Sequence, residues 1–177
     1  WAFINTLEAD NGTNMEPALR AALEKQPSLS PGMLRQVVFI TDGAVRNEDK
    51  LFRLIKKQLG HTRLFTVGIG GAPNSHFMRK AAQFGRGSFT YIATPAEVDV
   101  AMSRLFEQLA GPQLQDLQVI WPGSAESFPA RIPDLYAGEP LVITARIDGT
   151  HSPLLARMSD GNDQWQQQVR LSSVSSY

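Results

Sequence analysis

The sequence predicts an α/β fold: a partial, doubly wound (Rossmann-like) parallel sheet, followed by a small antiparallel β segment. Short apolar runs alternate with longer amphipathic segments over the first 111 residues, and this alternation is typical of a parallel sheet with right-handed crossovers. The run at 37–40 contains four consecutive apolar residues, as in a strand buried on both faces. After residue 112 the apolar residues recur with a period of two, which indicates antiparallel strands.

The part of the chain before this run predicts two helical stretches. In residues 1–9 the apolar residues lie three or four apart, which favours the last turns of a helix. A second helical face begins at Met15 and continues to about Lys25. Thr13 and Glu16 have the spacing of a capping box, so Thr13 has a structural interpretation as a helix cap.

The next helix and strand are bounded by glycines. A helix is expected over residues 48–59, with Asn47 as its cap and Gly60 as its stop. Residues 64–69 then form an apolar strand that ends in a glycine-rich turn. Pro73 occupies the place of the third glycine of a dinucleotide-binding fingerprint, so we interpret this turn as structural.

A further helix, strand and helix complete the α/β pattern. A helix is expected over residues 75–84 and a strand over 88–92. The stretch at 94–97 combines a capping box with a proline at the first helical position, and predicts a helix that ends before Gly111. Its predicted core face consists of Val98, Met102, Leu105, Phe106 and Leu109.

The rest of the chain has the pattern of β-structure. Apolar and polar residues alternate at 117–121 and 141–147, and 154–158 and 165–171 are shorter strand candidates. Turn dipeptides such as Asp-Gly separate these segments. We therefore expect two domains, residues 1–111 and residues 112–177, the second with the pattern of part of a β-sandwich.

The composition describes an ordinary globular chain without a charge excess. Lys plus Arg and Asp plus Glu each number 17 of the 177 residues, so the net charge is zero. A chain without a basic excess is a poor candidate for nucleic-acid binding. The absence of cysteine excludes disulfides, zinc–thiolate sites and cysteine nucleophiles within this chain. Because no apolar run approaches the roughly 20 residues of a membrane span, we expect no membrane contact by this chain itself.

Asp42 is the main candidate for a functional side chain. It follows the apolar run directly, at the edge of an open α/β sheet where ligands bind. Asp42 has a structural interpretation as well, because Asp-Gly is common in turns. His61, His76 and His151 have no metal-ligand spacing, and the sequence contains no nucleophile elbow, Walker loop or second acid beside Asp42. Hydrolytic or transfer catalysis therefore receives little support.

Thr13 and Asp42 are both in loops expected at the carboxyl edge of the sheet. A hydroxyl and a carboxylate suit a hard divalent cation such as Mg²⁺, which takes oxygen ligands and keeps several waters. Two oxygens are too few to hold the cation alone.

Three segments in this order carry a resemblance to a known family: Asn11–Leu19, Val37–Gly43 and Thr66–Gly70. Over about residues 1–111 the sequence resembles the second half of a von Willebrand factor type A domain. It is most similar to the bacterial branch that looks like inter-alpha-trypsin inhibitor heavy chains, in which a VIT domain precedes the A domain and a β-rich tail follows. The run Pro133–Pro140 resembles that tail.

The resemblance implies a metal-ion-dependent adhesion site (MIDAS) in which Thr13 contacts the cation and Asp42 acts directly or through water. The loop with the pattern Asp-x-Ser-x-Ser, which completes such a site, is absent from this sequence. We therefore interpret the chain as a truncated domain with an incomplete site. The intact parent domain is expected to bind Mg²⁺ or Mn²⁺, and this chain to bind the cation weakly or not at all.

The expected function is binding of a protein ligand through a divalent cation, without catalysis. The alternative hypothesis is a doubly wound phosphoryl-transfer or hydrolytic enzyme that uses Asp42, and a third is a scaffold that binds no metal. The resemblance further implies a bacterial, extracytoplasmic protein, secreted or held at the cell envelope. Because the strand at 37–40 lacks the neighbour that the family's sheet gives it, we also expect self-association through an exposed sheet edge.

Overall fold

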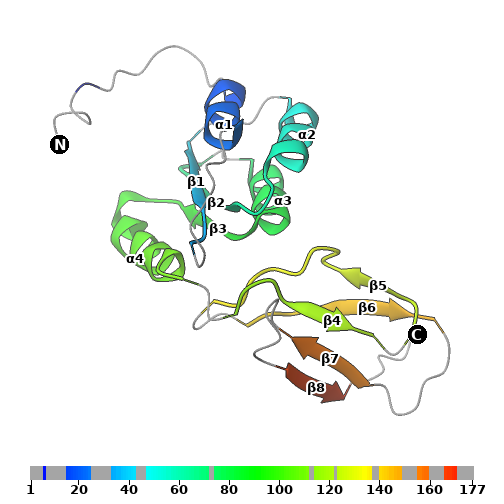
Figure 1. The fold of residues 1–177 in the computed structure, drawn as a ribbon. Coiled ribbons are helices and arrows are strands. Elements are labelled where there is room, and N and C mark those ends of the chain that lie inside the picture. The colour runs from blue at the N-terminus through cyan, green and yellow to red at the C-terminus, as the bar shows by residue number, and fades with distance from the viewer. Residues whose placement is uncertain are drawn as a thin grey trace.

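A computed structural model gives the architecture of most of the chain. It describes residues 6, 15–24, 33–42, 47–71, 74–111, 114–121, 123–136, 140–148, 155–159 and 166–170. Within these residues a parallel sheet with its helices stands beside a group of antiparallel strands (Figure 1). This arrangement confirms the predicted α/β fold with a small antiparallel segment. In the described residues no helix is both long and apolar enough to cross a membrane.

The parallel sheet has β2 (Arg63–Ile69) at its centre, between β1 (Gln36–Thr41) and β3 (Arg86–Ile92). All residues of β2 except the last are buried. Among the described residues β1 pairs with β2 alone, and Ile40 in β1 is 52% exposed. The prediction that the strand at 37–40 is buried on both faces is therefore wrong, because β1 is only partly buried. The central strand β2 is the buried one; among the described residues β1 lies at the edge of the sheet.

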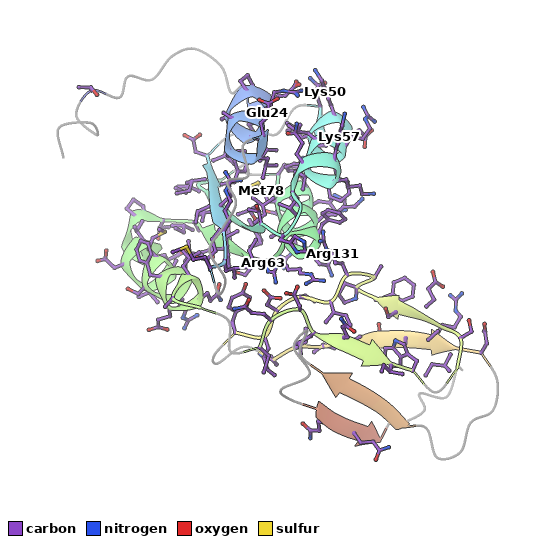
Figure 2. The ribbon with its side chains drawn as sticks, in the orientation of Figure 1. Glu24, Lys50, Lys57, Arg63, Met78 and Arg131 are labelled. Atoms are coloured by element: carbon purple, nitrogen blue, oxygen red, sulfur yellow. The ribbon has the colours of Figure 1, made fainter. Side chains whose placement is uncertain are left out.

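Three helices pack their apolar residues together against one face of the sheet. They are α1 (Met15–Glu24), α2 (Glu48–Gln58) and α3 (Ser75–Phe84). Figure 2 shows Met78 of α3 in the middle of this layer, and its side chain is fully buried. The shared core consists of Met15, Leu19, Leu23, Leu51, Leu54, Ile55, Leu59, Leu64, Phe77, Met78 and Ala81. It includes Leu51, Leu54, Ile55 and Leu59, the apolar residues three and four apart that form the predicted core face of the helix at 48–59.

The last helix, α4 (Val98–Leu109), follows a short 3₁₀ turn, η2 (Pro95–Glu97), and covers the opposite face of the sheet. Leu105 of α4 is buried against β2 and β3. The prediction that Phe106 belongs to the core face is wrong, because its side chain is 61% exposed, and Val98 is also exposed. Gln108 is buried instead and accepts a hydrogen bond from Ser88 Oγ at 2.5 Å. In the described part of the chain this sheet has three strands, and α4 buries only a narrow stripe against it, at Leu105 and Gln108.

The helix caps differ in part from those predicted. Asn47 lies at the start of α2, but it adopts a left-handed conformation (φ 58°) and its side chain makes no capping hydrogen bond. Asparagine tolerates this conformation well. Asn47 therefore holds the cap position through its carbonyl oxygen, which accepts from the Lys50 and Leu51 N–H groups, and not through its side chain. Asn74 is the residue that caps a helix, since it accepts a hydrogen bond from the Phe77 N–H at 3.1 Å. At the predicted capping box, Glu97 accepts from Thr94 Oγ1 at 3.1 Å and from the Ala93 N–H at 3.0 Å.

The antiparallel part contains two small sheets. One sheet has the order β4 (Gln118–Ile120), β7 (Leu155–Ser159) and β8 (Gln166–Arg170). In the other, β5 (Ala125–Phe128) pairs with β6 (Thr144–Ile147). Four of these strands, β4, β6, β7 and β8, overlap predicted strands, whereas the sequence did not predict β5.

A buried ion pair joins the parallel sheet to the segment that follows α4. Arg63, the first residue of β2, donates from Nε to Asp134 Oδ2 at 2.5 Å and from Nη2 to Asp134 Oδ1 at 3.0 Å. Both side chains are almost completely buried. Burial alone would lower the pKa of Arg63, but the hydrogen bonds and negative charge of Asp134 and Asp116 outweigh it and raise that pKa.

An aromatic contact stands beside this ion pair. Tyr136 is buried with its ring edge-on to Phe65 of β2, the centroids 5.7 Å apart. Its hydroxyl donates a hydrogen bond to the Arg86 carbonyl oxygen at 3.1 Å. The segment around Asp134 and Tyr136 is therefore bound closely to the start of β2 and β3.

Candidate functional site

The carboxyl edge of the parallel sheet holds the side chain that the sequence singled out. β1 ends at Thr41, which is buried, and Asp42 follows with an exposed side chain. None of the salt bridges among the described residues involves Asp42. Its carboxylate is therefore presented to solvent at the end of a strand, as predicted.

Backbone groups hold the neighbouring loops at the same edge. Gly70 follows β2 with a left-handed conformation (φ 82°), and its N–H donates to the Ile92 carbonyl oxygen at 2.9 Å. The Tyr91 hydroxyl donates to the Gly70 carbonyl oxygen, also at 2.9 Å. These contacts fix the ends of β2 and β3 relative to each other, which agrees with the interpretation of the glycine-rich turn as structural.

The first residues of α2 and α3 also lie at this edge, because each helix runs back along the strand that precedes it. Glu48 accepts a hydrogen bond from Asn74 Nδ2 across the two helix starts. Asn74 is at the same time the cap of α3. The carboxylate of Glu48 is thus engaged in joining two helices.

The described side chains at the carboxyl edge include oxygen donors of the kind that a hard cation prefers, but too few of them to hold it. Thr13 lies outside the described residues, so its predicted pairing with Asp42 stays a prediction. In the part of the chain that the structure describes, no group of three or more His, Cys, Asp or Glu side chains could hold a metal ion. His61 and His76 are exposed, and His151 lies outside the described residues. Asp42 offers the oxygen donors that Mg²⁺ prefers, but further ligands are needed.

Comparisons with known protein families and solved structures agree with the parallel sheet and its helices. A family model described as the von Willebrand factor type A domain matches residues 1–91, which is half of the chain. The chain belongs to the von Willebrand factor type A family. A solved structure described as von Willebrand factor type A from Catenulispora acidiphila superposes with a TM-score of 0.60 at 17% identity, covering 93% of this chain and 47% of that one.

Two longer relatives match parts of this von Willebrand A chain. A von Willebrand factor A domain-containing protein of Dictyostelium discoideum is 28% identical over 149 residues, which cover 82% of this chain and 16% of that protein. The Protein mono-ADP-ribosyltransferase PARP4 of Homo sapiens is 29% identical over 121 residues, which cover 62% of this chain and 7% of that protein. The chain thus spans less than a fifth of the length of these curated relatives.

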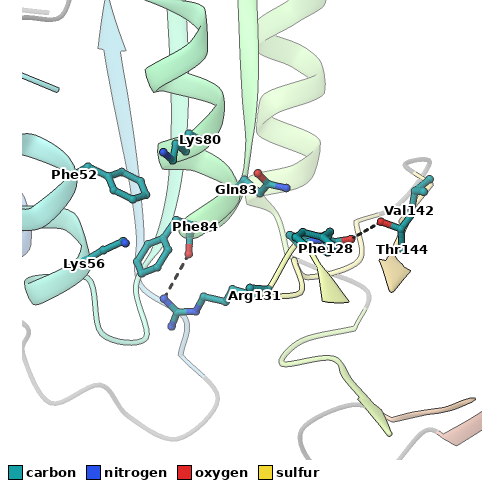
Figure 3. A pocket seen from close by; sticks show the side chains of 11 residues that line it. Phe52, Lys56, Lys80, Gln83, Phe84, Phe128, Arg131, Val142 and Thr144 are labelled. Carbon is teal, nitrogen blue, oxygen red and sulfur yellow. Dashed lines mark hydrogen bonds between the residues drawn. The ribbon is translucent and has the colours of Figure 1, made fainter. Parts of the chain in front are cut away.

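A second feature, which the sequence did not predict, lies at the opposite edge of the sheet. A cleft of about 690 Å³ is bounded by the carboxyl ends of α2 and α3 and by the β5–β6 pair (Figure 3). Three phenylalanines line it, and each comes from a different segment of the chain: Phe52, Phe84 and Phe128. Nothing in the sequence indicated this cleft, because the three phenylalanines lie far apart along the chain and share no motif.

Proposed function

We propose that this von Willebrand A chain is part of a protein-binding domain that holds its ligand through Mg²⁺ or Mn²⁺ at the carboxyl edge of the sheet. The observation that carries the proposal is the exposed Asp42 carboxylate directly after β1 in a sheet of this family. Thr13 is the proposed second donor. Because the sequence contains no Asp-x-Ser-x-Ser, the complete set needs donors from outside these 177 residues.

The chemistry of such a site is ligand exchange at the cation. A bound Mg²⁺ or Mn²⁺ offers a coordination position to an acidic side chain of the partner protein. Asp42 would hold the cation directly or through water. The proposal assigns no catalytic step to this chain.

Calorimetric titration with Mn²⁺ tests the proposal on the chain itself. We expect no saturable site at micromolar concentration, and weak binding at millimolar concentration that the Asp42→Asn variant removes. Asp49→Asn is the matched control, because Asp49 is exposed in the first turn of α2. A micromolar site in this chain, or weak binding that survives Asp42→Asn, would contradict the proposal.

The enzymatic alternative has its own readout. A phosphoryl-transfer or hydrolytic enzyme would turn over a generic phosphate ester, and the Asp42→Asn variant would abolish this turnover. The name of the human relative describes an enzyme, but this chain matches only 7% of that protein. We therefore base no activity of this chain on it.

The setting of the domain is a proposal that rests on the resemblance described above. We propose a bacterial protein related to inter-alpha-trypsin inhibitor heavy chains, with a VIT domain, residues 1–111 as part of the A domain, and residues 112–177 as a β-rich segment. An extracytoplasmic location follows from the same resemblance. A full-length gene without a signal peptide or membrane anchor would contradict the location.

Self-association through β1 is part of the same proposal. Among the described residues β1 has a paired neighbour on one side alone. An unpaired strand edge presents N–H and C=O groups that readily recruit another strand. A second copy of this chain is the proposed partner of that edge.

A further inference from the structure

The cleft between α2, α3 and the β5–β6 pair has an unusual lining. Its volume of about 690 Å³ is in the range of ligand sites in proteins. Three aromatic rings and three cationic side chains contribute to it, and they are Phe52, Phe84, Phe128, Lys56, Lys80 and Arg131. Figure 3 shows the cations and the rings of Phe52 and Phe84 gathered on one side of the cleft.

The cleft lies at the amino edge of the parallel sheet, away from Asp42. Arg131 donates to the Gly60 carbonyl oxygen at 3.3 Å and to the Phe84 carbonyl oxygen at 3.4 Å. Gly60 and Phe84 come shortly before β2 and β3 begin, whereas Asp42 comes after β1 ends. The cleft and the proposed cation site are therefore at opposite edges of one sheet.

Cation–π contacts hold the positive charges over the aromatic side of the cleft. Lys56 Nζ lies 4.9 Å from the centroid of the Phe52 ring, and Lys80 Nζ lies 5.1 Å from the same centroid. The Arg131 guanidinium lies 5.0 Å from the centroid of the Phe84 ring. Phe52 and Phe84 themselves pack edge to face with centroids 5.6 Å apart. The three charges are thus placed together and partly ordered before any ligand arrives.

Among the described residues, no acidic side chain lines the cleft or forms an ion pair with these three cations; Asp116 and Asp134 act on Arg131 only as more weakly opposing charges. None of the residues that line the cleft is Asp or Glu, and none of the ion pairs in the same part of the chain uses Lys56, Lys80 or Arg131. The pKa of Arg131 is lowered by its burial and then by repulsion from Arg86 and Arg63. The site therefore favours a negatively charged ligand.

The opposite wall of the cleft is apolar and open. Phe128 is 50% exposed and Val142 is 72% exposed. Arginine and aromatic side chains are enriched in the contact surfaces of proteins. A chain with zero net charge lacks the basic field that nucleic-acid binding uses.

We propose that this cleft binds an acidic segment of another protein, whose carboxylates contact Lys56, Lys80 and Arg131 while an apolar side chain packs against Phe128 and Val142. Charge complementarity selects this partner, and the exposed apolar wall adds the requirement for an apolar anchor. Binding here needs no metal ion. The proposal is independent of the function assigned to Asp42.

Fluorescence anisotropy with labelled hexapeptides tests the proposal on the whole chain. The probe is Glu-Phe-Glu-Glu-Leu-Glu, and the comparison peptides replace either every Glu by Lys or both apolar residues by Ser. At about 0.15 M salt, we expect the acidic probe to bind at least tenfold more tightly than either comparison peptide. Millimolar EDTA and the Asp42→Asn variant leave its affinity unchanged.

Charge-removing variants locate the binding. The double variant Lys56→Gln, Lys80→Gln should weaken the acidic probe at least tenfold. The double variant Lys57→Gln, Arg104→Gln is the matched control, because both side chains are exposed and neither lines the cleft. Figure 2 shows Lys57 on α2, the helix that also carries Lys56. Thermal melts of both variants should match that of the wild type.

Several results would overturn the proposal. These are no binding of the acidic probe, equal weakening by the control variant, or equal binding of the lysine peptide. Oligothymidine that binds more tightly than the acidic probe, and is weakened by the cleft variant, would assign the cleft to single-stranded nucleic acid instead.

Discussion

At the scale of single residues, the Arg63–Asp134 pair is the most deeply buried ion pair among the described residues. Both side chains are buried, and Asp134 also accepts from the Asp116 N–H at 3.1 Å. Replacing a well-matched buried ion pair by apolar residues is often nearly neutral, whereas removing one partner leaves an uncompensated buried charge. The pair therefore ties the segment around Asp116 and Asp134 to the start of β2.

The Asp134→Ala variant should lose about 3 kcal/mol of unfolding free energy, because it leaves Arg63 buried with only Asp116 as a charged partner. Chemical denaturation measures this loss. The control is Glu126→Ala, which breaks the exposed pair with Arg146 and should cost less than about 1 kcal/mol. The double variant Arg63→Met, Asp134→Leu should be more stable than Asp134→Ala alone. Equal losses for Asp134→Ala and Glu126→Ala would contradict the assigned role of the buried pair.

At the scale of elements, the pairing of β2 with β3 depends on a close approach of the two backbones at Gly87. The register advances by two residues in β2 and by three in β3 between Leu64 and Thr66, so β3 carries an extra residue there. A Cβ atom on Gly87 would overlap the carbonyl oxygen of Leu64 and lie 2.9 Å from its carbonyl carbon. The backbones can approach this closely only without a side chain.

The Gly87→Ala variant should lose about 1–3 kcal/mol of unfolding free energy, because the strands must separate to admit the methyl group. Gly71→Ala is the control, since nothing lies within 4 Å of the position that its methyl group would take, and its effect should stay within about 0.5 kcal/mol. Chemical denaturation of both variants gives the comparison. If Gly87→Ala left the unfolding free energy unchanged, the backbones of β2 and β3 would not approach as closely at Gly87 as the structure shows.

The sequence predicted most elements because their periodicity is local. The faces of α2 and α3 follow from apolar residues three and four apart, and their packing obeys that spacing. For α4 the same reasoning placed Phe106 in the core, and it failed because periodicity does not show how wide the covering sheet is. Neither does it distinguish an edge strand from a central one, which is why the strand at 37–40 was expected to be buried on both faces.

Long-range contacts escaped prediction for a different reason. Arg63 and Asp134 lie 71 positions apart, and no short motif relates them. One signal was available: an arginine at the start of an apolar strand needs a partner if it is buried. Of the predicted site residues, Asp42 lies where the sequence placed it, at the end of β1, because a strand end followed by Asp-Gly is a local signal.

At the scale of the whole molecule, the edge of β1 makes the association state testable. The Ile40→Lys variant places a charge on the exposed edge strand, which discourages pairing with another strand. Sedimentation over a range of concentrations should show self-association of the wild type and a monomer for Ile40→Lys. Val100→Lys, on the exposed side of α4, is the control and should associate like the wild type. A wild-type chain that stays monomeric at high concentration would refute this prediction.

At the scale of the whole molecule, the two edges of the parallel sheet carry opposite charges. The carboxyl edge exposes the carboxylate of Asp42, where we propose a cation, and the amino edge carries the cationic cleft around Arg131. A cation should therefore be attracted to one edge and repelled from the other. Because the charges at each edge attract or repel a cation even when it binds weakly, a weakly bound cation such as Mn²⁺ can distinguish the two edges.

Paramagnetic broadening of amide NMR signals by Mn²⁺ is the most direct measurement of the proposed cation site. In millimolar Mn²⁺, the amides of Asp42 and Gly70 at the carboxyl edge should broaden first, and Asp42→Asn should remove the effect. The amides of Gly60 and Phe84, at the amino edge beside Arg131, should stay sharp. Broadening at the amino edge, or at the carboxyl edge of the Asp42→Asn variant, would contradict a cation site built on Asp42.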